Sequence, residues 1–334
     1  MDSLTQIVLG AAVAEALAGR KIGNRAILYG GILGTIPDLD VVVGSFYDIV
    51  TSNDIHRGFS HSIVFFLLAS PILGLLLKKF ESKNGLTLWE GINMAFWCLF
   101  THALLDAFTN WGTQLFWPLE KRVSIQSIFV IDPLYTLPFL LCLIMAMRLR
   151  RDNPRRARWN RLGLAISSSY LLLTLLLQSY ARHRFDQALT ANGRQVSRLS
   201  VRPAPLNAIL WNANAKVDNG YLLGEYSLFD KSEITFRYFP KDSVLLGGHI
   251  NAPVIKRLIR MSEGWYSISQ SGGKLYFNDM RFGLISEESK EDEFVFRYEL
   301  RESSGTLTAH VAESPARREP GKLLKRLWKR MWGN

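Results

Sequence analysis

The chain has 334 residues, a mean hydropathy of +0.06 and a formal net charge of +11, values that suit a basic soluble enzyme. The charge is uneven, however, because residues 1–180 hold only 28 of the 69 Asp, Glu, Lys and Arg residues. Two short blocks, 148–161 and 316–334, each carry a net charge of +6 and account for the whole basic excess. This distribution argues against a nucleic-acid partner, and two Cys residues exclude a disulfide scaffold. We expect a membrane domain followed by a soluble one.

Two short apolar segments rich in Gly and Ala open the chain, at 4–19 and 26–37. They predict either two thin helices that pack closely on their neighbours or a re-entrant hairpin, since small residues allow close helix contact. No basic residue precedes the first segment and Asp2 stands at its head, so a cleaved signal peptide is not expected.

Four longer apolar runs approach the roughly 20 residues that a helix needs to cross a bilayer. They cover residues 60–77, 90–108, 128–147 and 162–180. The sequence therefore predicts a multi-pass α-helical membrane domain over 1–180, with four clear spans and a short N-terminal helical pair. Lys and Arg concentrate in the connections 19–25, 78–83 and 148–161, which favours the cytoplasm for these three loops. An alternating path then places the loops 38–59 and 109–127, and the chain after residue 181, on the outer face.

After residue 181 the pattern changes to short runs in which apolar and polar residues alternate. This pattern predicts a small extramembrane α+β domain over 181–315, with a helix near 251–262 and a polar helix over 183–199. Its expected strands are 220–229, 233–239, 264–269, 274–278, 293–300 and 306–311. In the basic tail 316–334, residues 321–333 alternate Leu and Trp with Lys and Arg at helical spacing. Such a helix suits an anionic membrane surface, so membrane lipids are an expected partner, whereas protein partners are not predicted.

Ionisable side chains at membrane depth are costly and are functional candidates. In the predicted topology the outer side gathers three His and three Asp residues: Asp38, Asp40, His56, His61, His102 and Asp106. Each has another interpretation: the two aspartates near residue 39 suit a turn or a helix cap, and His61 follows Ser60, a candidate N-cap. His102 and Asp106 share one helix face and could brace two helices by a hydrogen bond. As a set, imidazoles and carboxylates are the ligands of hydrolytic Zn²⁺, Mn²⁺ or Fe sites, with one or two ions.

Several segments also resemble a known family. The opening MDSLTQIVLGAAVAEA, the GTIPDLD turn, HRGFSHS, HALLDAFTNWG and IDPLYT resemble the bacterial family of inner-membrane, metal-dependent hydrolases of the YdjM type. PLNAILW, YSLFD and LYFNDMRFG are similar to longer members. The resemblance implies a protein of the bacterial cytoplasmic membrane with its polar centre on the six His and Asp residues above. Many relatives have His where this chain has Gln6, so we expect Gln6 to hold a water or a carboxylate.

The leading hypothesis is a membrane-embedded metal-dependent hydrolase, in which metal-activated water attacks an ester or phosphoester of an amphiphilic, lipid-like substrate at the outer face. The expected cofactor is a divalent metal, with Zn favoured over Mn or Fe. The expected metal ligands are Asp38, Asp40, His61, His102 and Asp106, and the expected catalytic residues are His56, Arg57 and Asp132.

Each catalytic candidate has a specific role. His56 would complete the metal shell or act as general acid or base. Arg57 would stabilise an anionic oxygen or, alternatively, pair with an Asp of the 38–54 loop. Asp132 would support a His from outside the metal shell or serve as a turn carboxylate before Pro133.

Two other classes of protein are alternatives. One is a non-catalytic metal-binding membrane protein whose soluble domain recruits a partner. The other is a metal or proton transporter, which the apolar segments 73–77 and 141–146 on the inner side disfavour.

Overall fold

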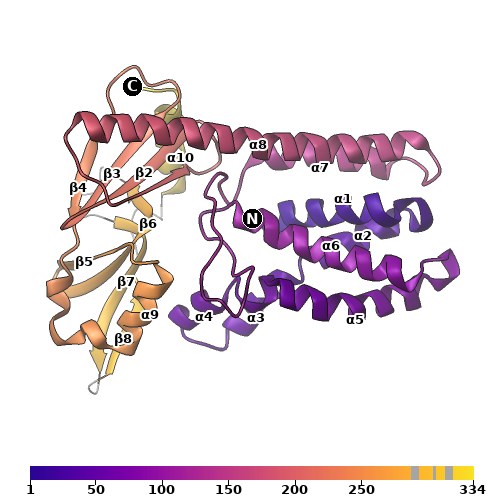
Figure 1. The fold of residues 1–334 in the computed structure, drawn as a ribbon, viewed down its shortest axis with the longest axis horizontal. Helices are drawn as coiled ribbons and strands as arrows, with labels where there is room; N and C mark the ends of the chain where they lie inside the picture. The colour runs from indigo at the N-terminus through magenta and orange to yellow at the C-terminus, as the bar shows by residue number, and fades with distance from the viewer. Residues whose placement is uncertain (287–292, 304–305, 313–318) are drawn as a thin grey trace. The chain divides into compact units, whose positions relative to one another are not determined.

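The computed structural model describes residues 1–286, 293–303, 306–312 and 319–334 (Figure 1). The chain divides into two compact units. The helical unit comprises Met1–Phe46, Ile55–Leu176 and Pro205–Asn207, and the sheet unit comprises Tyr47–Asp54, Leu177–Ala204 and Ala208–Asn334. The boundary expected between residues 315 and 316 lies outside the described residues.

The helical unit consists of α-helices and short 3₁₀ turns. Its elements are α1 (Ser3–Ile22), α2 (Asn24–Leu33), η1 (Pro37–Leu39), α3 (Asp40–Gly44), η2 (Phe59–His61), α5 (Ile63–Glu81), η3 (Ser82–Asn84), α6 (Leu88–Ala107), α7 (Pro133–Met147) and the first part of α8 (Pro154–Ala191). Asp2 caps the N-terminus of α1, and Thr87 and Glu90 form a capping box at the start of α6. These caps satisfy backbone N–H groups that an apolar surrounding would leave without partners.

Glycines allow two pairs of these helices to approach until their backbones touch. A Cβ atom on Gly10 of α1 would lie 2.3 Å from the carbonyl oxygen of Gly30 in α2, and one on Gly91 of α6 would lie 2.7 Å from that of Gly74 in α5. Only a residue without a side chain fits such a crossing. The Gly- and Ala-rich start of the chain therefore forms two helices in close contact, as Figure 1 shows for α1 and α2.

Three helical segments among the described residues are long and apolar enough to cross a membrane: Asn24–Gly44, Ile63–Asn84 and Pro154–Ala191. The prediction of four clear spans is not confirmed. The expected span 128–147 yields only the 15-residue helix α7, since the helix begins at Pro133. The expected span 90–108 corresponds to α6, in which Asn93, His102 and Asp106 interrupt the apolar sequence. Conversely, the short segment 26–37 lies within a candidate span, because α2, η1 and α3 together make up Asn24–Gly44.

The sheet unit contains two antiparallel sheets of four strands each, ordered β1-β2-β3-β4 and β5-β6-β7-β8. The strands are β1 (Arg198–Pro203), β2 (Leu210–Val217), β3 (Gly220–Ser227), β4 (Phe236–Pro240), β5 (Tyr266–Ser271), β6 (Lys274–Ser286), β7 (Glu293–Ser303) and β8 (Thr306–Val311). Its helical elements are the end of α8, α4 (Ile49–Ile55, as far as Asp54), η4 (Ser243–Asn251), α9 (Pro253–Met261) and α10 (Pro320–Met331). The expected helices near 251–262 and 321–333 are thus present, whereas the sequence did not predict β1 and β2.

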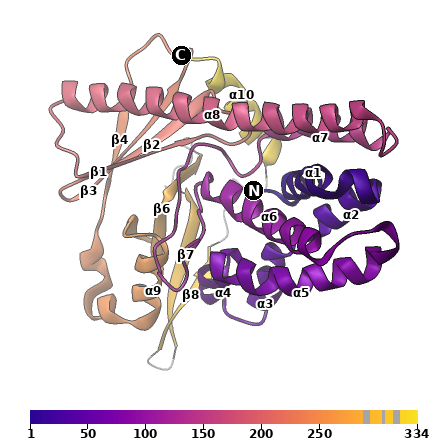
Figure 2. The ribbon, with the colours of Figure 1, turned by 45° about the vertical axis from the view of Figure 1, so that its right-hand side comes forward.

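Each sheet of this unit has its own apolar core. Phe185 of α8 packs with Trp211 and Tyr226 of the first sheet, and Figure 2 shows that sheet beside the end of α8. On the second sheet, Val50 of α4 and Ile255 of α9 pack with strand residues such as Phe277 and Tyr298. The segment 47–54 therefore belongs to the sheet unit, although helical-unit residues precede and follow it in the sequence.

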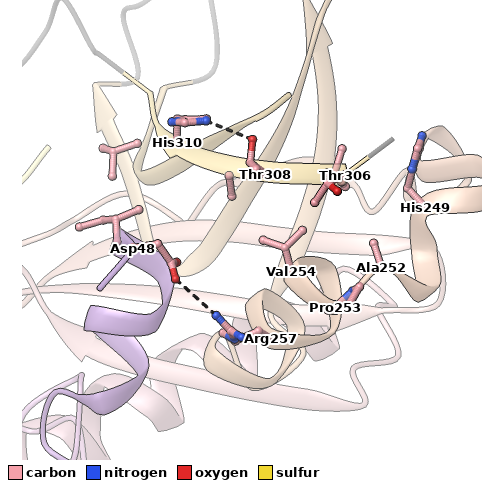
Figure 3. Close-up of a pocket in the computed structure, with 13 residues that line it drawn as sticks. Asp48, His249, Ala252, Pro253, Val254, Arg257, Thr306, Thr308 and His310 are labelled. Atoms are coloured by element: carbon pink, nitrogen blue, oxygen red, sulfur yellow. Dashed lines mark hydrogen bonds and ion pairs between the residues drawn. The ribbon is translucent and has the colours of Figure 1, made fainter. Parts of the chain in front are cut away.

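A half-open pocket of about 1090 Å³ lies beside β8 in the sheet unit (Figure 3). Its lining includes His249 of η4, Arg257 of α9 and His310 of β8. Arg257 is paired with Asp48 at 3.7 Å, so the charge of the guanidinium is already compensated.

Candidate metal centre

Four side chains of types that can bind a metal converge on one point from three parts of the helical unit. Asp38 comes from η1, His61 from η2, and His102 and Asp106 from successive turns of α6. The two His residues and Asp106 are completely buried, and the side chain of Asp38 is 23% exposed. Among the described residues, one ligand atom from each of the four lies within 4.8 Å of the others.

The distances that involve a histidine nitrogen match a tetrahedral site. The two Nε2 atoms of His61 and His102 are 3.1 Å apart. Asp38 Oδ1 lies 3.4 and 3.5 Å from them, and Asp106 Oδ2 lies 3.5 and 3.7 Å from them. A tetrahedral Zn²⁺ with bonds of about 2.0–2.1 Å places its ligand atoms about 3.3–3.4 Å from one another. The observed separations therefore suit one small cation at the centre of the four atoms.

Hydrogen bonds fix which nitrogen of each imidazole faces this point. His102 Nδ1 lies 2.6 Å from the carbonyl oxygen of Gly34, so Nδ1 must be the donor, and in the neutral imidazole Nε2 then keeps its lone pair. Ser60 donates its hydroxyl proton to Asp40 Oδ2 at 2.8 Å, so the Ser60 oxygen accepts from His61 Nδ1 at 3.0 Å. When both rings are neutral, both Nε2 lone pairs therefore point into the site. A cation relieves the repulsion between them, as in metal-bound His residues whose other nitrogen is held by hydrogen bonds.

The carboxylates support the same interpretation. Asp38 Oδ1 and Asp106 Oδ2 are buried acceptor atoms that receive no hydrogen bond within the described part of the chain. Buried polar atoms normally have partners, and an atom without one indicates a missing ion or water. Asp106 Oδ2 also has Arg57 Nε at 3.0 Å, so one cationic group already lies beside the site. The residues present therefore fit a divalent cation.

Asp40 occupies a different position from Asp38. Its Oδ2 accepts the Ser60 hydroxyl and the backbone N–H of Arg57, both at 2.8 Å, and its Oδ1 lies 2.9 Å from His56 Nδ1. Asp38, Asp40 and His56 also form a second group of potential ligands. In this structure Asp40 binds both ends of the turn at residues 56–61 and orients His61 through Ser60.

Arg57 is held in an unusual conformation at this site. Its φ of +60° is a left-handed backbone conformation that costs a residue with a side chain about 1–3 kcal/mol. The buried guanidinium donates from Nη1 to Thr109 at 3.0 Å and pairs with Asp106. The backbone N–H, rather than the side chain, contacts Asp40 in the 38–54 loop.

Gln6 binds a carboxylate, one of the two roles expected for it. It is completely buried, and its Nε2 donates to Asp106 Oδ1 at 2.9 Å and to the carbonyl oxygen of His102 at 3.2 Å. The amino group of Met1 also contacts Asp106 Oδ1. These donors fix one carboxylate oxygen of Asp106 and leave the other facing the site.

The structure brings together seven of the eight residues predicted for the site and separates Asp132 from them. Asp132 caps the N-terminus of α7 by accepting from the backbone of Leu134 at 3.0 Å, and it accepts from the hydroxyl of Tyr170 at 2.9 Å. Ser60 also links His61 to Asp40, a contact that no pattern in the sequence predicts. Ser60 was a candidate helix cap, but the cap of α5 is Ser62, whose Oγ accepts from Phe65 at 3.1 Å.

Apolar side chains are exposed close to these ligands in the sequence. Val41, Val42 and Val43, which follow Asp40, are 52–60% exposed. Phe59, in the same turn as His61, is 42% exposed and has its ring 5.0 Å from that of Trp117. Such apolar exposure marks a surface that contacts lipid or another apolar partner.

Comparisons with known proteins agree with this picture of a membrane protein. The family described as YdjM inner membrane protein matches residues 1–185. YfhP of Bacillus subtilis (strain 168), an uncharacterized protein, is 30% identical over 142 residues, which cover 40% of this chain and 42% of YfhP. Inner membrane protein YbcI of Escherichia coli (strain K12) is 29% identical over 115 residues, 34% of this chain and 64% of YbcI.

The match to each of these relatives thus covers less than two thirds of the relative's length. No solved structure matches the chain. The family match covers more than half of the chain, including all four residues of the tetrahedral cluster and the candidate spans as far as residue 185. The chain therefore belongs to the YdjM inner membrane protein family.

Proposed function

We propose that this protein is a membrane-embedded metal-dependent hydrolase whose metal centre is formed by Asp38, His61, His102 and Asp106. The observation that carries the proposal is the tetrahedral arrangement of four buried acceptor atoms, 3.1–3.7 Å apart for the pairs that include a histidine nitrogen. Two imidazoles and two carboxylates favour Zn²⁺ over Mn²⁺ or Fe, because small tetrahedral sites suit zinc. When bound, such a cation lowers the pKa of water toward neutrality and polarises the bond to be cleaved.

Residues beside the metal ligands would supply the remaining chemistry. The side chain of His56 is 26% exposed, and Asp40 at 2.9 Å favours a proton on its Nδ1. Nε2 of His56 is then available to take a proton from water and, once it has done so, to give that proton to a leaving group. Arg57 would stabilise negative charge on a phosphate or tetrahedral oxygen, because its guanidinium is buried next to Asp106 at the edge of the site.

The exposed apolar residues near the site support an amphiphilic substrate. A water-soluble ester would gain nothing from Phe59, Trp117 and the valines after Asp40, whereas the acyl chains of a lipid would bury this surface. We therefore propose a lipid-like ester or phosphoester as the substrate.

The proposed topology is multi-pass, with the metal centre and the sheet unit on the outer face of the cytoplasmic membrane. It rests on the excess of Lys and Arg in the connections 19–25, 78–83 and 148–161. A reporter fused after residue 310 tests it: activity only in the cytoplasm would overturn this placement.

One observation favours a non-catalytic metal site as a second candidate function. Catalytic zinc sites usually have three protein ligands and an open position, whereas four protein ligands close a tetrahedral site. Here four ligand atoms converge. Asp38 is the only one of the four with an exposed side chain, so the hydrolase proposal requires Asp38 to leave the metal or the metal to accept a fifth ligand.

Elemental analysis tests the metal centre, and activity measurements separate the two candidate functions. Detergent-purified wild type is compared with His61→Ala and His102→Ala, and with His310→Ala, an exposed histidine of the sheet unit, as the matched control. We expect metal in the wild type and the control and little in the two site variants. An equal metal content in all four proteins would show that His61 and His102 do not bind the metal and would refute the proposed metal centre. Chelator-sensitive hydrolysis across a panel of lipid esters and phosphoesters supports the hydrolase, and metal without exchangeable water or hydrolysis supports the non-catalytic site.

A further inference from the structure

Helix α10 of the sheet unit has two different faces. Leu327 and Met331 point inward and pack on Ala204 and Leu210, whereas Leu324, Trp328 and Trp332 are 52%, 62% and 54% exposed. The three exposed residues occur every fourth position, so they follow one stripe that covers about 80° of the helix circumference. Large apolar side chains in one exposed stripe indicate a surface that binds something.

The exposed stripe continues onto the neighbouring loop. Phe229 is 48% exposed, and its ring stacks on that of Trp332 at 5.4 Å with an interplanar angle of 17°. Trp328 contacts Trp332 edge-on at 5.6 Å. Leu324, Trp328, Trp332 and Phe229 thus form one apolar patch, which we call the Trp patch.

Ion pairs fix the orientation of this patch. Arg330 binds Asp230 through two contacts, at 2.7 and 2.8 Å, and it donates to the carbonyl oxygen of Glu225 at 3.2 Å. Ser227 donates its hydroxyl proton to the carbonyl oxygen of Met331. Because these contacts lie on the inner face, α10 cannot turn the Trp patch toward its own sheet without breaking them.

Lysines flank the Trp patch on one side. Lys322, Lys325 and Lys329 are exposed. Around the helix circumference they lie next to the stripe of Leu324, Trp328 and Trp332, within about the next 80°. Membrane-surface helices combine these two features, because Trp prefers the headgroup level and Lys reaches up to anionic phosphates while its stem stays apolar. A protein partner would not require a row of lysines alongside a row of Leu and Trp residues.

We propose that α10 binds the headgroup region of an anionic bilayer through the Trp patch and its flanking lysines. The charge pattern and the membership of the chain in an inner membrane protein family favour a lipid surface over a protein partner. This inference is independent of the metal centre and of the hydrolase activity.

A fluorescence experiment on the full-length protein in lipid nanodiscs tests the proposal. Leu324→Cys carries an environment-sensitive NBD fluorophore, and Val244→Cys, which replaces a 90% exposed residue of the same unit, is the control position. Cys98 and Cys142 are buried, so labelling of the wild type provides the blank. Nitroxide lipids quench the fluorophore and are placed either in the disc or in added vesicles, with phosphatidylcholine alone or mixed with phosphatidylglycerol.

We expect anionic lipid to shift the emission of the Leu324→Cys label to the blue and to quench it, and to leave the Val244→Cys label unchanged. Adding Lys325→Glu and Lys329→Glu should abolish most of this response, since each lysine near an anionic surface strengthens binding about fivefold. Equal emission and quenching at both label positions, in discs and with vesicles, would overturn the proposal. A response that does not depend on anionic lipid or on the two lysines would also overturn it.

Discussion

Asp38 and Asp40 are two residues apart, yet the structure predicts different consequences for metal binding when each is replaced. Asp38 Oδ1 lies 3.4 and 3.5 Å from the Nε2 atoms of His61 and His102, where a metal ligand must be. Asp40 is instead 3.5 Å from the Nδ1 atom of His61, on the far side of that ring, and it accepts the hydroxyl proton of Ser60. Asp38 should therefore bind the metal, and Asp40 should orient one of its ligands.

The two roles differ in magnitude. Structural Zn²⁺ sites bind with about 10–16 kcal/mol, so one of four ligands contributes about 2.5–4 kcal/mol. We therefore expect Asp38→Ala to weaken metal affinity about 100- to 1,000-fold. Loss of a residue that orients a metal-bound His typically weakens affinity about 10- to 100-fold, which is the range that we expect for Asp40→Asn.

Competition with a chelating fluorophore measures these affinities in detergent-purified protein, and His310→Ala serves as the control that should bind metal as the wild type does. Asp38→Ala should fold, because the side chain is partly exposed and caps no helix in the structure. Near-UV circular dichroism and gel filtration check the fold of each variant. If Asp40→Asn loses as much affinity as Asp38→Ala or more, Asp40 is a ligand and the assigned orientation of His61 is wrong.

Three further predictions concern stability. Glu15→Ala should destabilise the protein by about 3–5 kcal/mol in thermal unfolding, because Arg156, which pairs with Glu15 at 2.6 Å, would become an uncompensated buried charge. A double variant, Glu15→Leu with Arg156→Met, should recover most of this loss of stability. If the double variant loses as much stability as Glu15→Ala, this account is wrong. Gly74→Val should cost about 1–3 kcal/mol, since a Cβ there would lie 2.6 Å from a backbone nitrogen of α6, and unchanged unfolding would refute the close crossing. Burial alone would raise the pKa of Asp230, but hydrogen bonds from Arg330 and from the backbone hold it below the ordinary value of 3.8. The ion pair therefore contributes stability above that pH and loses it as the pH falls through the lowered pKa, so the difference in melting temperature between wild type and Asp230→Asn should shrink on acidification; a constant difference would exclude an ionic contribution.

The chemistry-bearing residues could be predicted from the sequence because their signal is local. His102 and Asp106 stand four residues apart in an apolar run, where an ionisable side chain needs a partner or a function. The basic amphipathic segment near residue 325 was equally visible, since its period matches a helix. His102 and Asp106 stand out from the apolar residues around them, and the segment near residue 325 repeats at helical spacing. Both signals can be recognised from a few neighbouring residues.

The remaining features depend on contacts between distant residues. β2 (LWNANAKV) was not predicted because Ala and Asn have low strand propensity, and the strand is stabilised by pairing on both edges with β1 and β3. The different roles of Asp38 and Asp40 follow from the turn at residues 56–61, which carries His56, Ser60 and His61. No spacing within the PDLD segment specifies which of the two carboxylates meets Nε2 atoms and which meets Nδ1 atoms.

The HRGFSHS segment shows how several of these distant contacts depend on a short stretch of chain. The left-handed conformation of Arg57 turns its backbone N–H toward Asp40 while its guanidinium reaches Asp106 and Thr109. A Cβ atom on the next residue, Gly58, would lie 2.8 Å from the carbonyl oxygen of Ile55, so a side chain there would force this turn open. The strain at Arg57 is therefore offset by contacts that also assemble the site, and this explains how one turn can orient His61 and place a cationic group beside the proposed metal centre.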